Sequence, residues 1–69
     1  MNEDKKKLKA LLEYWVEHNR EHAQEFKEWA EKAREMGEIE IEEEIMQAVG
    51  HMNRVNEMLE KTLGRLQEV

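Results

Sequence analysis

The sequence contains no cysteine, no serine and no proline. Without cysteine, disulfides and thiolate metal sites are excluded. Without cysteine and serine, the commonest catalytic nucleophiles are missing as well. Glycine occurs only at positions 37, 50 and 64, so there is no glycine-rich loop that could hold a phosphate group. We therefore expect a chain that is not an enzyme.

Long apolar runs and positive charge are also scarce. No apolar stretch approaches the roughly 18 residues of a membrane span, and residues 1–12 lack the apolar core and cleavage site of a signal peptide. The net charge is -6, whereas nucleic-acid binding requires a basic face. We therefore expect a cytoplasmic protein that binds neither nucleic acid nor a membrane.

Charged residues are abundant, at 41% of the chain, and the apolar residues between them have helical periodicity. Spacings of four and three residues alternate in two series, which is the heptad pattern of packed helices. The first series is Leu8, Leu12, Trp15, Asn19, His22, Phe26, Trp29, Ala33 and Met36. The second series is Ile41, Ile45, Ala48, Met52, Val55, Leu59, Thr62, Leu66 and Val69.

Gly37 separates the two series. Glycine readily takes the left-handed conformation that ends helices, and the glutamates that follow it suit the start of a second helix. We predict a single all-α domain over residues 1–69, an antiparallel two-helix hairpin. Its helices should span about 3–36 and about 39–67, joined by a turn at about 37–38. Residue numbers facing each other across the hairpin should then sum to roughly 75, which places Asn19 beside Asn56.

The apolar stripe of the first helix is wider than a strict coiled-coil seam, because four further residues flank it. A hairpin has only one inner face with which to cover two tryptophans and a phenylalanine. We therefore expect self-association, most simply as a homodimer that forms a four-helix bundle. Lysines at the start of the first helix and glutamates near the turn favour antiparallel hairpins, which bring opposite charges together. The flanking residues are Leu11, Val16, Ala23 and Ala30.

Two histidines, His18 and His22, are four residues apart and so project from one face of a helix. Imidazoles at this spacing can chelate a transition metal. Glu21 and Glu25 lie within one turn of them and offer carboxylate oxygens. The predicted register puts His51 of the second helix at a similar height. Such a set of ligands would suit zinc, nickel or cobalt.

The alternative interpretation needs no ligand. His22 is then a partly buried histidine that hydrogen-bonds to Asn19, to Glu25 or to a partner chain, while His18 and His51 are solvated. Asn19 and Asn56 pair in the core and fix the register at some cost in stability. In that case the chain is a purely structural or protein–protein interaction module.

The stretch WVEHNREHAQEFKEWAEKA resembles a small family of uncharacterised prokaryotic helical domains. These domains share the pattern Trp-Ile/Val-Glu-His-Asn-x-Glu-His-Ala, followed by an aromatic residue. They stand alone or beside histidine-rich segments related to nickel or cobalt, a tract that this chain lacks. The resemblance implies a helical fold and marks Trp15, His18, Asn19, His22, Phe26 and Trp29.

Overall fold

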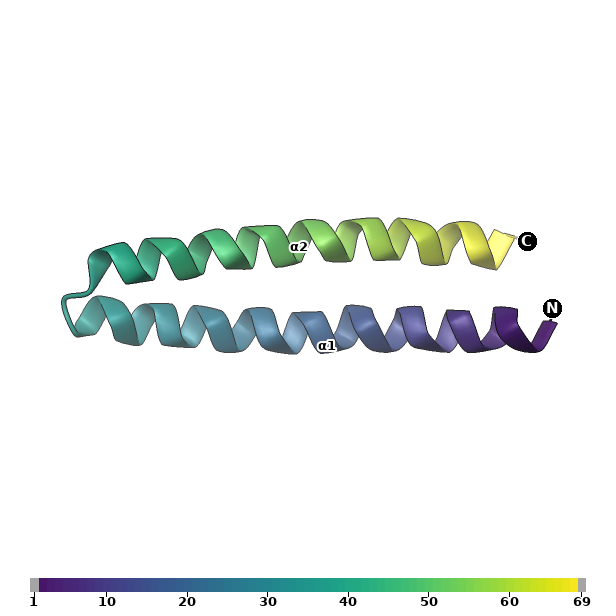
Figure 1. Cartoon of the computed structure of the whole chain (residues 1–69), viewed down its shortest axis with the longest axis horizontal. Helices are drawn as coiled ribbons and strands as arrows, with labels where there is room; N and C mark the ends of the chain where they lie inside the picture. The colour runs from purple at the N-terminus through teal and green to yellow at the C-terminus, as the bar shows by residue number, and fades with distance from the viewer. Residues whose placement is uncertain (1, 69) are drawn as a thin grey trace.

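The computed structural model describes residues 2–68 and consists of two long helices. Helix α1 spans Asn2–Glu35 and helix α2 spans Ile39–Glu68. They run antiparallel, with the turn at one end of the molecule and both ends of the chain at the other (Figure 1). The Cα atoms fill a rod of 52 × 14 × 12 Å. In the described part of the chain, neither helix has the length and hydropathy that a membrane crossing would require.

Gly37 ends α1 in the predicted left-handed conformation, with φ of 82°. The Gly37 N–H donates to the Arg34 carbonyl at 2.9 Å, and the Glu38 N–H donates to the Ala33 carbonyl at 2.9 Å. These two bonds form a Schellman motif, which satisfies carbonyls that a helix end leaves free. Glu38 then starts the next helix, because its carbonyl accepts the first α2 bond, from the Glu42 N–H at 3.0 Å.

The core between the helices is narrow and consists mainly of small side chains. On α1 the spacing alternates between four and three once the half-buried Asn19 and Phe26 are included, and this line shares every second position with the predicted series. Alanine and valine let two helix axes approach closely, so they form the contact within the hairpin. The buried residues are Leu12, Val16, Ala23, Ala30, Ala33, Val49 and Asn56.

The predicted seam was therefore right at Leu12 and Ala33, which are buried, and wrong at the positions that alternate with them. Trp15 and Trp29, expected in the hairpin core, are 39% and 56% exposed. On α2, Val55 is 48% exposed, and the predicted seam position Val69 lies outside the described residues. The physical reason is rotation of α1: it turns the small line of Val16, Ala23 and Ala30 inward, which leaves the tryptophans on the surface.

Asn19 and Asn56 fix the register of the two helices, as predicted. The Asn19 side-chain amide donates to the Asn56 side-chain oxygen at 2.9 Å. The Asn56 amide donates in turn to the Val16 backbone carbonyl at 3.0 Å. Asn56 is buried, so these bonds satisfy polar groups that would otherwise be costly to remove from water. The pair confirms that facing residue numbers sum to roughly 75.

Candidate functional site

Ion pairs identify one broad side of the hairpin as its charged face. Arg20 donates to Glu60 across the helices at 2.7 Å, and it lies 3.6 Å from Glu17. Near the turn, Arg34 lies 3.7 Å from Glu42. Lys27, Arg34, Glu42 and Met46 line one shallow hollow on this side. The charged face thus comprises the α1 line through Arg20 and Arg34, and the α2 line through Met46 and Glu60.

The opposite side is apolar. Heptad geometry puts the α1 line through Trp15 and Trp29 on the other flank of the core from Arg20. It likewise puts the α2 line through Val55 on the other flank from Glu60. Both lines therefore share one side of the rod, here called the apolar face. Its members by heptad position are Leu8, Leu11, Trp15, His18, His22, Glu25, Trp29, Lys32 and Met36 of α1, and Ile41, Glu44, Ala48, His51, Val55, Met58, Thr62 and Arg65 of α2.

The apolar face repeats the heptad pattern of the core. Along α1, the series Leu8, Leu11, Trp15, His18 and His22 again alternates spacings of three and four. Each helix therefore carries two adjacent seams, of which only one is covered within the chain. Besides the two tryptophans, the other large apolar side chains on this face are exposed, among them Met36, Ile41 and Met58. Such an arrangement is typical of a helix that packs against two neighbours.

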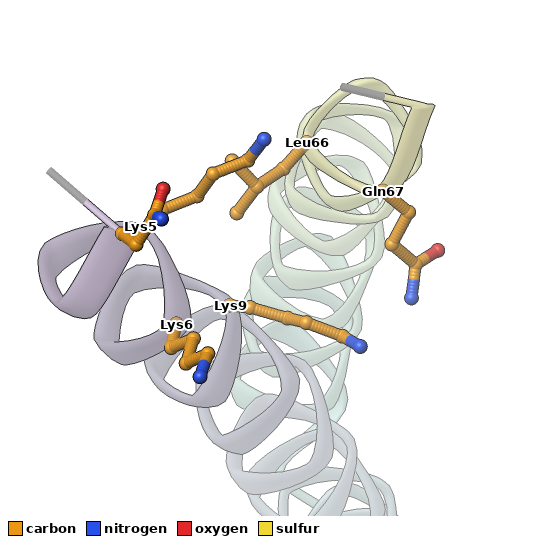
Figure 2. A pocket seen from close by; sticks show the side chains of 6 residues that line it. Lys5, Lys6, Lys9, Leu66 and Gln67 are labelled. Carbon is orange, nitrogen blue, oxygen red and sulfur yellow. The ribbon is translucent and has the colours of Figure 1, made fainter.

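The two ends of the hairpin differ in charge. At the open end, Lys5, Lys6 and Lys9 line a hollow of about 490 Å³ together with Asn2, Leu66 and Gln67. Figure 2 shows Lys5 and Lys9 of α1 there, with Leu66 and Gln67 of α2 beside them. At the turn end, glutamates at 38, 40, 42, 43 and 44 follow Gly37. The rod therefore has a basic pole and an acidic pole.

His18 and His22 form a close pair on the apolar face. Their Nε2 atoms are 3.0 Å apart, and one imidazole donates a hydrogen bond to the other. His22 is half-buried and His18 is exposed. The pair lies near the middle of α1, which runs from Asn2 to Glu35. The pair is thus a polar interruption of the apolar series near the centre of the face.

Four aromatic rings form a ladder that holds this pair in place. The Tyr14 ring stacks on His18 with centroids 5.3 Å apart, His18 meets His22 edge-on at 4.4 Å, and the Phe26 centroid is 6.2 Å from that of His22. The spacing of four residues carries the ladder from the exposed Tyr14 to the half-buried Phe26. Sequence reasoning missed Tyr14, although its i, i+4 relation to His18 was available.

The separation of the two imidazoles suits a shared metal ion. Two nitrogens bound to one tetrahedral zinc ion at about 2.0–2.1 Å are about 3.3 Å apart, and the two Nε2 atoms are already 3.0 Å apart. Two ligands do not complete a site, however. Among residues 2–68, no group of three or more histidine, aspartate or glutamate side chains is placed to hold a metal.

The other predicted ligands do not join the pair within one chain. His51 is exposed on α2, where it lines a shallow hollow with Gln47, Gly50 and Arg54. Glu21 and Glu25 are both exposed on α1. The structure therefore brings together His18 and His22, and it does not join His51, Glu21 or Glu25 to them within one chain.

Comparisons with known proteins show that most of this chain is shared with its relatives. A family model described as a domain of unknown function (DUF8180) matches residues 8–66. A protein of Archaeoglobus fulgidus, described as uncharacterized, is 39% identical over 57 residues, which are 83% of this chain and 90% of that protein. No solved structure matches. The matched region contains the histidine pair, the turn and most of the apolar face.

Proposed function

Because this chain belongs to the family described as a domain of unknown function (DUF8180), we propose its role from its own surface. It is a small homo-oligomeric helical module in which two hairpins pair through their apolar faces into a four-helix bundle. The observation that carries this proposal is the contrast between a core rich in alanine and valine and the exposure of both tryptophans. A short chain with so small a core gains the missing burial from a second copy.

The exposed surface area of the chain is large enough for an interface with a second copy. The chain exposes 5736 Å². A compact monomer of 8.4 kDa exposes about 4,600 Å², so the excess is about 1,100 Å². A standard protein interface buries about 800 Å² on each partner. The excess is therefore large enough to supply one such interface per chain.

The charges favour hairpins with their turns at opposite ends. This orientation sets the lysines of one open end against the glutamates of the other turn, whereas the parallel orientation would bring like charges together. Stacked in this way, α1 lies along α1 of the partner subunit in the opposite direction, and α2 lies along its α2. A two-fold axis near Val55 would then set Glu44 opposite Arg65 of the partner subunit, an ion pair of opposite charges.

Sedimentation equilibrium at micromolar concentration tests this proposal. We expect a mass close to twice 8.4 kDa. A well-folded monomer over the whole micromolar range would refute it, because the apolar face would then have no second copy to cover it.

A second candidate function is the binding of a divalent transition metal by His18 and His22, favoured by the 3.0 Å separation of their Nε2 atoms. A thermal melt with EDTA, then with added zinc, nickel or cobalt, tests it. A metal that binds only the folded state raises the melting temperature with concentration. If no metal shifts the melt, the module is purely structural.

A further inference from the structure

We propose that the antiparallel dimer brings the two histidine pairs together on its two-fold axis, where four imidazoles bind one divalent transition metal ion. This inference rests on the proposed self-association. It differs from a site on one chain because the partner subunit supplies half of the ligands. The motivating observation is the place of His18 and His22 at the centre of the uncovered face.

The position of the axis follows from the lengths of the helices. The midpoint of Asn2–Glu35 falls between His18 and Asn19. The midpoint of Ile39–Glu68 falls between Asn53 and Arg54, which lie opposite about residues 21 and 22 in the observed register. The centre of the hairpin is therefore between His18 and His22. Full overlap of two antiparallel hairpins puts the axis there, and it sets His18 of one chain opposite His22 of the partner subunit.

The direction of the side chains agrees with this position. His22 is on the heptad line next to the core, with Trp15 and Trp29, and His18 is on the next line outward, with Leu11. The outward direction of the apolar face lies between these two lines. Both imidazoles therefore project toward a second copy placed on that face, as paired seam residues do in a bundle.

The chemistry explains why two chains are needed. A zinc ion in a closed site takes four ligands in tetrahedral geometry, and the described residues of one chain bring only two imidazoles together. Two such pairs supply four nitrogens without any carboxylate. Neutral imidazoles suit zinc, copper, nickel and cobalt in preference to calcium or magnesium. Surrounding tryptophans and Phe26 would exclude water from the ion, and the stacked Tyr14 ring would hold His18 in position.

Metal occupancy would also strengthen the dimer. The site is complete only when two chains meet, so binding energy from the metal adds to the energy of association. Without metal, the four imidazoles form a polar patch in an otherwise apolar interface, which weakens it. The dimer should therefore respond to metal concentration.

Titration of zinc chloride into the protein, followed by calorimetry and by sedimentation equilibrium, tests the shared site. We expect one zinc ion per two chains and a dimer dissociation constant that falls about tenfold or more at saturating zinc. His18→Ala and His22→Gln should each remove both effects. Glu21→Ala is the matched control, because Glu21 is exposed on the same helix but outside the apolar face, and it should keep both. Circular dichroism confirms that each variant remains helical.

The outcomes separate this inference from the proposed function. A stable dimer that takes up no zinc would overturn the shared site and leave self-association intact. One zinc per chain, or zinc uptake without tighter dimerisation, would overturn it equally. A monomer with and without zinc would overturn the proposed function itself. A His18→Ala protein that keeps the full zinc response would exclude the four-imidazole site.

Discussion

Asn19 and Asn56 join the two helices by a 2.9 Å hydrogen bond between their side-chain amides, inside a core that is otherwise apolar. The Asn56 amide also bonds the Val16 carbonyl. Sliding one helix past the other would break both bonds at once and leave polar groups buried without partners. A buried asparagine of this kind selects one alignment of packed helices at a cost in stability.

Asn56→Ala should destabilise the hairpin by about 1–3 kcal/mol, because it leaves the Asn19 amide in the core without its acceptor. Urea denaturation followed by circular dichroism at fixed protein concentration measures the change. Asn53→Ala, on an exposed position of the same helix, should stay within about 0.5 kcal/mol of the unmodified protein. Equal losses for the two variants would show that the pair has no special role.

Gly37→Val should cost roughly 1–2 kcal/mol, because a β-branched residue is strained in the left-handed conformation that Gly37 adopts with φ of 82°. The comparison is Gly50→Ala in the middle of α2, where an added Cβ meets nothing within 4 Å. That change should stabilise the helix by up to about 1 kcal/mol. Thermal melts should therefore show a lower melting temperature for Gly37→Val and a higher one for Gly50→Ala. An unchanged melting temperature for Gly37→Val would contradict the role of Gly37 in the turn.

Trp29→Glu should convert the dimer to a monomer while most of the helix remains, because Trp29 is on the apolar face and outside the hairpin core. Met46→Glu is the matched control: Met46 is also partly exposed, but it belongs to the charged face. It should leave the dimer intact. Light scattering and circular dichroism distinguish the two results. Loss of assembly in both variants would mean that the interface is not confined to the apolar face.

Salt should weaken the dimer, because its orientation brings basic and acidic poles together. Raising sodium chloride from about 0.05 to about 0.5 M shortens the screening length severalfold, so the dissociation constant should rise. Lys5→Glu, at the basic hollow, should weaken the dimer and flatten the salt dependence. Lys27→Glu, an exposed lysine of the charged face, makes the same charge change as a control. A dimer that tightens with salt would indicate an orientation set by apolar contacts alone.

The fold was largely predictable from the sequence because its signals are local. Gly37 is the one glycine between two heptad series, and it ends α1 as expected. Once the turn is placed, the antiparallel register follows from the constant rise of a helix. The pairing of Asn19 with Asn56 was therefore predicted correctly.

The choice of the inner seam was not predictable from spacing alone. The line through Trp15 and Trp29 and the line through Val16, Ala23 and Ala30 both repeat every seven residues. The larger side chains appeared to be the better core, because they bury more area. On α1, however, close approach of the helix axes outweighs the area of each side chain, so the line of small residues faces inward.

The histidine pair was predictable and its surroundings were not. His18 and His22 are neighbours on one helix, so their 3.0 Å contact follows from their spacing. The position of His51 depends instead on the rotation of α2 about its own axis. A shift of one heptad line moves it away from the helix interface to the exposed surface beside Arg54.

The position of Trp15 and Trp29 outside the hairpin core gives the chain separate optical signals for folding and for assembly. Far-ultraviolet circular dichroism follows the two helices, whereas indole fluorescence follows the face on which both tryptophans lie. Dilution below the dimer dissociation constant should shift the fluorescence toward longer wavelength as water reaches the rings. The Lys32 ammonium, 4.1 Å from the Trp29 ring centroid, would remain over one of them. The unmodified chain thus reports its own association state without an attached dye.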